Sequence, residues 1–230
     1  MDFSHFSTIS FDCYGTLINW EAGILPALRT VLARHHYELD DSAILELYGE
    51  FEAHAESGPY RKYREVLQSV VHSLGQRLGF NASSHDMRTL SESVPAWPPF
   101  SDTADALQKL KKRFRLAIIS NIDDDLFAKS QKLLGVEFDA VITAEQAQSY
   151  KPSVRNFELA LERLAIDRSH LLHVGQSIYH DVLPAQSLGI ATAWVNRKSA
   201  RPGIGAVRAA DGKPDLEVPD LATLAAQASG

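Results

Sequence analysis

The sequence FDCYGTL at residues 11–17 decides the fold of this chain. The apolar and β-branched run at residues 7–11 predicts a strand that stops at Asp12. A turn that contains Gly15 and the hydroxyl of Thr16 follows at once. Ligands of α/β proteins sit at the carboxyl ends of strands, but Asp-x-x-Gly sequences also form ordinary turns. The stretch alone therefore leaves two interpretations open, an active site and a plain turn.

Length and composition limit the classes of protein to which this chain can belong. The 230 residues are enough for one large core, or for a core with an insertion. The net charge of −6 argues against general nucleic-acid affinity, which needs a basic face. No apolar run approaches the roughly 20 residues of a membrane span, and the first residues lack a signal-peptide pattern. A single cysteine, Cys13, is typical of a reducing compartment. We expect a cytoplasmic protein that binds neither nucleic acid nor membrane.

The part of the chain before residue 98 is helical in pattern after the first strand. Apolar residues recur at helical spacing in four segments, and Pro95, Pro98 and Pro99 follow the last of them. The segments start near residues 20, 42, 60 and 83. With no strand between them, they predict a helical cap domain at residues 19–97. The core domain would then comprise residues 1–18 and 98–230.

From residue 102 onward, amphipathic helices alternate with apolar strands. The predicted strands lie at residues 116–119, 140–142, 171–175 and 191–195. The predicted helices lie at residues 102–114, 125–134, 154–164, 181–188 and 220–227, and residues 198–214 are expected to be a solvated loop. This alternation predicts an α/β fold with a parallel sheet covered on both faces. Right-handed crossovers then place all carboxyl ends of the strands at one edge.

Polar residues gather at this predicted edge. They are Asp12, Thr16, Ser120, Asn121, Lys151, Ser177 and Asp181. Pro152 prevents a helix from starting before Lys151, so the ammonium could point back at the strand ends. Each residue alone also has an ordinary interpretation, such as a surface lysine, a helix N-cap at Ser120, or a helix-dipole partner at Asp181. Together, and in this order, they indicate a catalytic site.

The four motifs resemble those of the haloacid dehalogenase superfamily of hydrolases. They are residues 12–17, Ser120-Asn121, Lys151-Pro152 and residues 175–181. Tyrosine at position 14 is similar to the branch of L-2-haloacid dehalogenases. The resemblance implies a Rossmann-like core whose parallel sheet is flanked by helices, plus an inserted helical cap. It also implies catalytic roles for Asp12, Thr16, Ser120, Lys151 and Asp181, and substrate-binding roles for Tyr14, Asn121 and Ser177.

By this resemblance, Asp12 is a covalent nucleophile. It attacks the halogen-bearing carbon and forms an aspartyl ester, which a water positioned by Asp181 and Ser177 then hydrolyses. Lys151 would lower the pKa of Asp12 and keep the carboxylate ionised. Thr16 and Ser120 would donate hydrogen bonds to the substrate or the ester, and Asn121 would help to receive the halide.

Two positions bear on the choice between dehalogenase and phosphatase. The phosphatases of the superfamily carry a second aspartate where this chain has Tyr14, and a phenol with an ordinary pKa of about 10 is a poor acid for a leaving alkoxide. They also carry an acidic metal ligand where this chain has Gln176, and an amide is a weak ligand for Mg²⁺. A halide leaves without a proton. We therefore expect displacement of halide from a small anionic 2-haloacid, with no cofactor required.

Two other functions stay open. One is a magnesium-dependent small-molecule phosphatase that holds the metal with Asp12, the Tyr14 carbonyl and Asp181. The other is a catalytically weak binding or regulatory protein of the same fold. The amphipathic cap helices could pack within the chain or across a homodimer.

The binding of an anion is the point on which the resemblance is incomplete. The dehalogenases receive the halide with an arginine of the first cap helices, and here Glu52 stands near the expected position. Arg61 and Arg64 either reach the pocket from the next helix or face solvent. The acids at residues 123–125 either add negative charge near the entrance or cap a helix.

Overall fold

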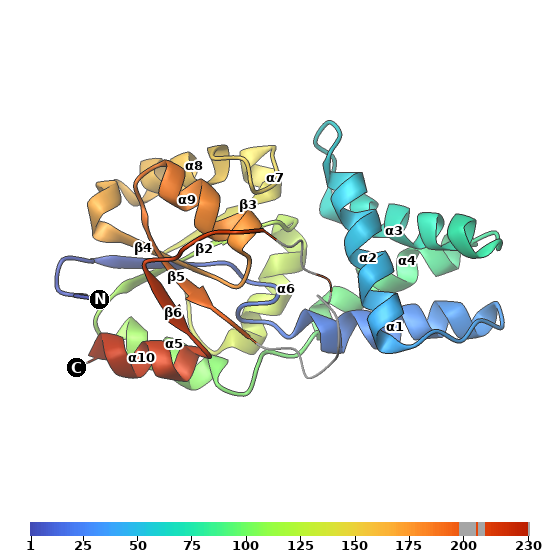
Figure 1. Cartoon of the computed structure of the whole chain (residues 1–230), viewed down its shortest axis with the longest axis horizontal. Coiled ribbons are helices and arrows are strands. Elements are labelled where there is room, and N and C mark those ends of the chain that lie inside the picture. The colour runs from blue at the N-terminus through green and yellow to red at the C-terminus, as the bar shows by residue number, and fades with distance from the viewer. Residues whose placement is uncertain (198–205, 207–209, 230) are drawn as a thin grey trace.

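The computed structural model describes residues 1–197, 206 and 210–229, so most of the loop expected at residues 198–214 lies outside the described residues. The chain folds into an α/β lobe and a helical lobe, and both termini lie on the α/β lobe (Figure 1). The α/β fold with an inserted helical cap is confirmed.

A six-stranded parallel sheet forms the centre of the α/β lobe. Its strands are β1 (Thr8–Phe11), β2 (Arg115–Ser120), β3 (Ala140–Thr143), β4 (Leu171–Gly175), β5 (Ala191–Val195) and β6 (Leu216–Val218). They lie in the order β3-β2-β1-β4-β5-β6, so the chain winds outward from β1 in both directions. Because all pairings are parallel, the carboxyl ends share one edge, and Asp12 lies near its middle. Five strands were predicted from the sequence, and β6 was not.

Helices cover both faces of the sheet (Figure 1). The helices of this lobe are α5 (Thr103–Lys111), α6 (Asp124–Leu134), α7 (Ala144–Ala147), α8 (Arg155–Leu164), α9 (Leu183–Ser187) and α10 (Leu221–Ser229). Strand β2 shows why both faces are apolar. Its Leu116 and Ile118 join the cluster that contains α5 and α10, while Ala117 and Ile119 join the one under α8 and α9. A π-helical turn, Ile178–Val182, precedes α9.

The cap consists of the four predicted helices between β1 and β2. They are α1 (Trp20–Arg34), α2 (Asp41–Glu56), α3 (Tyr63–Leu78) and α4 (Ser84–Ser93), followed by a 3₁₀ turn, Val94–Ala96. Local capping explains three of the starts. The side chains of Asn19 and Asp40 accept backbone N–H groups of α1 and α2, and Ser83 forms a capping box with Asp86 at α4.

Helix α3 takes its N-cap from the other lobe. The fully buried Asp123 carboxylate accepts the backbone N–H groups of Tyr63 at 2.7 Å and Arg64 at 3.1 Å, and also Nε of Arg64 at 3.1 Å. A carboxylate satisfies the free N–H groups of a helix start and interacts favourably with its dipole. The sequence left open whether the acids at residues 123–125 cap a helix or add charge at the pocket entrance. Asp123 caps a helix, and that helix is α3 of the cap domain. Asp125 also pairs with Arg64.

One apolar cluster continues from the core lobe into the cap. Trp97, 1% exposed, lies edge-on to the Tyr14 ring with centroids 5.8 Å apart. Its indole covers Gly23 of α1 so closely that a Cβ there would come within 2.1 Å of Trp97 Cγ. Gly23 thus allows α1 to approach the segment that returns the chain to the core.

We expect Gly23→Ala to lower the free energy of unfolding by about 1–3 kcal/mol, because the added methyl group must displace the buried indole. At a helix position with free space around it, Gly→Ala would raise the free energy of unfolding by about 1 kcal/mol. The sign of the measured change therefore shows whether the indole contact exists. Urea unfolding measures it. The control is Gly58→Ala, where a Cβ meets nothing within 4 Å and the change should stay within about 0.5 kcal/mol. A Gly23→Ala protein as stable as the parent would contradict the close contact.

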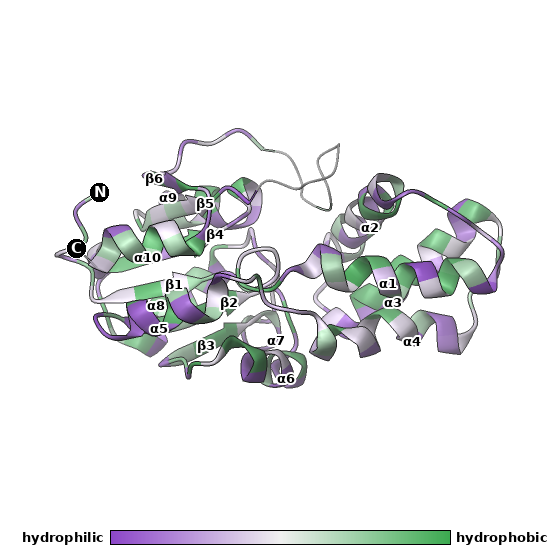
Figure 2. Cartoon of the chain, turned by 90° about the horizontal axis from the view of Figure 1, so that it is seen from below, coloured by the Kyte–Doolittle hydropathy of each residue, from purple (hydrophilic) through white to green (hydrophobic). Residues whose placement is uncertain are grey.

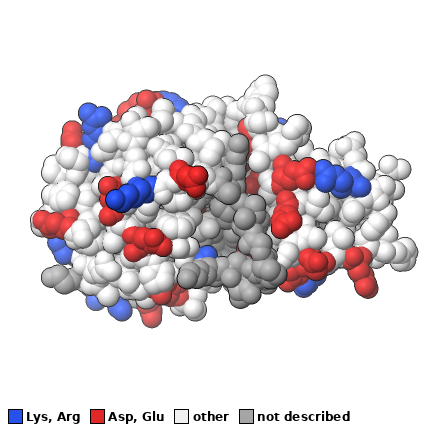
Figure 3. Space-filling model, viewed as in Figure 1, with Lys and Arg blue, Asp and Glu red and all other residues white. Residues whose placement is uncertain are grey.

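The described helices include none that is long and apolar enough to cross a membrane. Several carry hydrophilic and hydrophobic faces along their length (Figure 2). On the face in Figure 3, the described Lys and Arg side chains are scattered among Asp and Glu and form no broad basic patch.

Candidate active site

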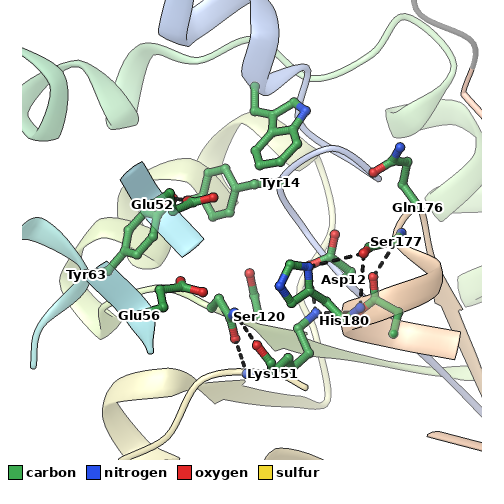
Figure 4. A pocket seen from close by; sticks show the side chains of 13 residues that line it. Asp12, Tyr14, Glu52, Glu56, Tyr63, Ser120, Lys151, Gln176, Ser177 and His180 are labelled. Atoms are coloured by element: carbon green, nitrogen blue, oxygen red, sulfur yellow. Dashed lines mark hydrogen bonds and ion pairs between the residues drawn. The ribbon is translucent and has the colours of Figure 1, made fainter. Parts of the chain in front are cut away.

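A pocket lies where the carboxyl edge of the sheet meets the cap (Figure 4). The core side of its wall is formed by Asp12, Tyr14, Ser120, Asn121, Lys151, Gln176, Ser177, His180 and Asp181. The cap side is formed by Trp20, Glu52, Glu56 and Tyr63. Seven of the eight residues named from the sequence line this pocket, and Thr16, the eighth, contacts Asp12 directly.

Lys151 joins the strand ends at the pocket floor. Its Nζ donates to Asp12 Oδ1 at 2.9 Å, to Asp181 Oδ1 at 2.6 Å and to the Ile119 carbonyl at 2.9 Å. An ammonium group has three N–H donors, so all three are used. Lys151 is only 2% exposed. Burial disfavours its charge, but the two carboxylates outweigh burial and raise the pKa of Lys151.

Asp12 is held by both carboxyl oxygens. Lys151 binds Oδ1, and the Thr16 hydroxyl donates to Oδ2 at 2.8 Å while it accepts the backbone N–H of Gln176 at 2.9 Å. Thr16 therefore orients the Asp12 carboxylate. Burial raises the pKa of Asp12 above its ordinary value, and Lys151 opposes this rise without cancelling it. As expected from the sequence, Lys151 lowers the pKa of Asp12, but burial of the carboxylate and the nearby Asp181 outweigh this effect.

Asp181 is fixed by a buried histidine that the sequence analysis missed. His173 Nε2 lies 3.2 Å from Asp181 Oδ1, and His173 Nδ1 lies 2.9 Å from Ser10 Oγ. Burial lowers the pKa of His173, which favours a neutral ring with Nε2–H donating to Asp181. Burial alone would raise the pKa of Asp181, but Lys151 and His173 lower it. The sequence signal that could have identified His173 is that it is the single polar residue in the apolar strand β4.

Tyr14 and Asn121 are both engaged by neighbouring groups. The Tyr14 hydroxyl lies 2.9 Å from Ser130 Oγ of α6, and burial raises the pKa of this phenol well above its ordinary value. Tyr14 is thus unsuited to proton donation. The Asn121 side chain accepts the Lys151 backbone N–H at 2.7 Å and donates to the Lys151 carbonyl at 3.2 Å. Asn121 therefore holds the segment that presents the lysine.

Two serines of the pocket differ in their surroundings. Ser177 Oγ accepts the backbone N–H of His180 at 3.0 Å and lies 3.2 Å from His180 Nδ1. Its backbone N–H donates to Asp181 Oδ2 at 3.2 Å. Ser120 lies at the end of β2, and its hydroxyl has no hydrogen bond to any residue that the structure describes. Ser120 can therefore donate to a bound molecule.

The cap presents two carboxyl groups to the pocket. Glu52 and Glu56 stand one helical turn apart on α2, opposite Asp12 (Figure 4). Tyr48 and Tyr63 donate their hydroxyls to Glu52 Oε1 at 2.6 and 2.5 Å. Burial raises the pKa of Glu52, and burial together with Glu52 raises the pKa of Glu56 well above its ordinary value. Glu56 was not identified from the sequence.

Neither candidate arginine lines the pocket. Arg64 pairs with Asp123 and Asp125, and Arg61 donates to the Ala55 carbonyl at 3.3 Å. Among the described residues, Lys151 is the only lysine or arginine of the pocket wall.

The residues proposed for a magnesium site do not fit a cation. Asp12 and Asp181 both bind the Lys151 ammonium, which already places a positive charge between them. Residues 1–197, 206 and 210–229 contain no group of three or more His, Cys, Asp or Glu arranged to hold a metal ion.

Replacement of Lys151 by methionine tests this network. We expect Lys151→Met to destabilise the protein by about 3–5 kcal/mol at neutral pH, because two buried carboxylates lose their cation. Their pKa values then rise above the unfolded values, so the lost stability returns as the pH falls and both groups take up protons. Chemical denaturation at several pH values measures both effects.

The control for this variant is Lys62→Met. It removes an exposed ion pair with Glu145 and should leave stability nearly unchanged. A Lys151→Met loss that does not depend on pH would contradict the charge network.

Comparison with known proteins agrees with the motif order. A family model described as haloacid dehalogenase-like hydrolase matches residues 6–189. The (S)-2-haloacid dehalogenase of Pseudomonas sp. (strain YL) is 30% identical over 141 residues, 60% of each chain. That of Pseudomonas putida is 26% identical over 226 residues, 94% of this chain and 93% of the other.

Two further similarities concern a phosphatase and the fold. The pyrophosphatase PpaX of Bacillus pumilus (strain SAFR-032) is 28% identical over 201 residues, 85% of each chain. The crystal structure of the defluorinating L-2-haloacid dehalogenase Rha0230 superposes with a TM-score of 0.84 at 20% identity, over 98% of this chain and 96% of that chain. The two chains share one fold.

Proposed function

Because this chain belongs to the haloacid dehalogenase-like hydrolase family, we propose that it removes halide hydrolytically from a small 2-haloacid through an ester on Asp12. The observation that carries the proposal is the setting of Asp12 in the pocket. Its carboxylate is anchored by Lys151 and Thr16, while Tyr14, at the position of the phosphatase acid, is turned to Ser130. Relatives named as (S)-2-haloacid dehalogenases support the same reaction class.

The proposed reaction has two steps. A carboxylate oxygen of Asp12 bonds to the halogen-bearing carbon, and the carbon–halogen bond breaks with its electron pair on the halide. Water then attacks the Asp12 carboxyl carbon, and the bond to the product oxygen breaks, which releases a 2-hydroxy product and a proton. We assign the orientation of this water to Asp181, with Ser177 beside it. Ser120 donates to the substrate or the ester.

The proposed domain boundaries lie where the chain leaves the core for the cap and where it returns. Asn19 N–H donates to the Pro98 carbonyl at 2.8 Å, and Phe100 N–H donates to the Leu17 carbonyl at 3.0 Å. These bonds support a cap at residues 19–97 and a core at residues 1–18 and 98–230. We place the enzyme in the cytoplasm on the basis of its single, fully buried cysteine.

We expect halide release from 2-chloro-, 2-bromo- or 2-fluoroacids in the presence of EDTA, measured with a halide electrode. Asp12→Asn should reduce the rate at least about a thousandfold, because the amide is a poor nucleophile. Circular dichroism verifies that the variant is folded. If none of these acids releases halide, the proposal fails.

The phosphatase alternative is suggested by the pyrophosphatase relatives. It predicts turnover of p-nitrophenyl phosphate that appears with Mg²⁺ and vanishes with a chelator, together with no halide release. The binding or regulatory alternative predicts that Asp12→Asn leaves the biological activity unchanged. An ester on Asp12, detected by mass, would exclude it.

A further inference from the structure

A polar pair interrupts one apolar face of the sheet. Ser10 of β1 and His173 of β4 are partners in the parallel pairing of the two strands, so their side chains lie side by side on one face. It is the face under α8, because the His173 ring packs edge-on against Phe157 with centroids 4.9 Å apart. Both polar residues are buried. A buried polar group is costly unless it is hydrogen-bonded, so the pair needs partners inside the protein.

These partners form a short chain that ends at Asp181. Ser10 Oγ lies 2.9 Å from His173 Nδ1, and His173 Nε2 lies 3.2 Å from Asp181 Oδ1. An ionised carboxylate only accepts hydrogen bonds, so Nε2 carries a hydrogen, and Nδ1 of a neutral ring then accepts the Ser10 hydroxyl. Burial lowers the pKa of His173, which agrees with a neutral ring. Ser10 thus selects the tautomer that directs an N–H group to Asp181.

The end of β4 also restricts the Asp181 side chain. A Cβ at Gly175 would come within 2.5 Å of Asp181 Cγ and Oδ2, so the carboxyl group lies against the backbone at the strand end. Its Oδ2 accepts the backbone N–H of Ser177 at 3.2 Å. The position of Oδ1 then depends on the side chains that donate to it.

Two side chains donate to Asp181 Oδ1, and they differ in their other partners. Lys151 Nζ, at 2.6 Å, also binds Asp12 at 2.9 Å, so it serves both carboxylates. His173 uses one ring nitrogen for Asp181 and the other for Ser10. A change at His173 therefore removes a donor from Asp181 and leaves the hydrogen bond between Lys151 and Asp12 in place.

We propose that His173, held by Ser10, is a positioning residue for the second half of the reaction, in which it keeps Asp181 in the orientation that places the hydrolytic water. This role rests on the proposed function. In that step the water oxygen bonds to the Asp12 carboxyl carbon, and the bond from this carbon to the product oxygen breaks. The product oxygen leaves as a hydroxyl group, the Asp12 carboxylate is restored and one proton is released. The first half, displacement of halide by Asp12, uses no water and should depend little on His173.

The rate constants of the two half-reactions test the proposal. In rapid-quench experiments with 2-chloropropionate, halide release reports formation of the ester, and the protein mass reports its loss. His173→Phe keeps a ring against Phe157 and removes both ring nitrogens. We expect ester hydrolysis to slow at least about tenfold, because the water loses its alignment, while ester formation stays within about threefold of the parent. The ester on Asp12 then accumulates, and halide appears in a burst that matches the enzyme concentration.

Two further variants separate positioning from a general loss of structure. His173→Gln can again donate an amide N–H to Asp181, so ester hydrolysis should recover to within several-fold of the parent. Ser10→Ala frees the ring to adopt the other tautomer and should slow ester hydrolysis several-fold with ester formation unchanged. It also covers a folding failure of His173→Phe. A purely structural role would slow both half-reactions alike.

The matched control is Thr192→Val. Thr192 of β5 is the partner of His173 in the next strand and is fully buried, but its hydroxyl binds Asp215 and Gln186. The change removes a buried polar group from the same row of the sheet, and the parent ratio of the two rate constants should persist. The same ratio in His173→Phe and Ser10→Ala overturns the inference and leaves the proposed function in place. A parent enzyme that releases no halide from any 2-haloacid overturns the proposed function itself.

Nitrogen NMR of the free enzyme reads the His173 tautomer independently of activity. With ¹⁵N-labelled histidine, and with His173→Gln to assign the signals, we expect a proton on Nε2 and none on Nδ1. Ser10→Ala should give a mixture of the two tautomers. A proton on Nδ1 of the parent overturns the inference, because Ser10 would then not direct the ring N–H to Asp181.

Discussion

The buried ammonium of Lys151 is the interaction on which this structure depends. It binds Asp12 after β1, the carbonyl of Ile119 in β2, and Asp181 in the π-helical turn after β4. Three charges removed from water are tolerated only when each is paired with good geometry. The three strand ends must therefore keep their mutual positions, and the parallel sheet fixes them. The same network fixes the Asp12 carboxylate in place before any substrate binds, and such preorganisation lowers the cost of reorganisation in a catalytic site.

The core supplies Asp12 and Lys151 to the pocket, and the cap supplies the opposite wall. Asp123 connects the two lobes because it caps α3, whose first residue, Tyr63, donates to Glu52 in the pocket wall. The close packing of Trp97 on Gly23 holds α1 against the segment that returns the chain to the core. These interdomain contacts therefore fix the cap side of the pocket wall.

Sequence patterns predicted the fold and the core side of the site for physical reasons. Strand β2 contains a continuous apolar run at residues 116–119, and three of the four cap helices carry local capping signals. Strand β6 and helix α7 are three and four residues long, too short for a periodic pattern to show. Glu56 and His173 were missed because only tertiary packing brings Glu56 of α2 to the pocket and turns His173 of β4 toward Asp181. The same packing directs Arg64 to Asp123.

The central claim is that Asp12 is a covalent nucleophile, and the isotope content of its carboxylate tests it most directly. In a single turnover in ¹⁸O-labelled water with enzyme in excess, the account predicts one ¹⁸O atom in the peptide that contains Asp12 and unlabelled oxygen in the new hydroxyl of the product. Water that attacked the substrate directly would put ¹⁸O in the product and leave Asp12 unlabelled. That result would contradict the account.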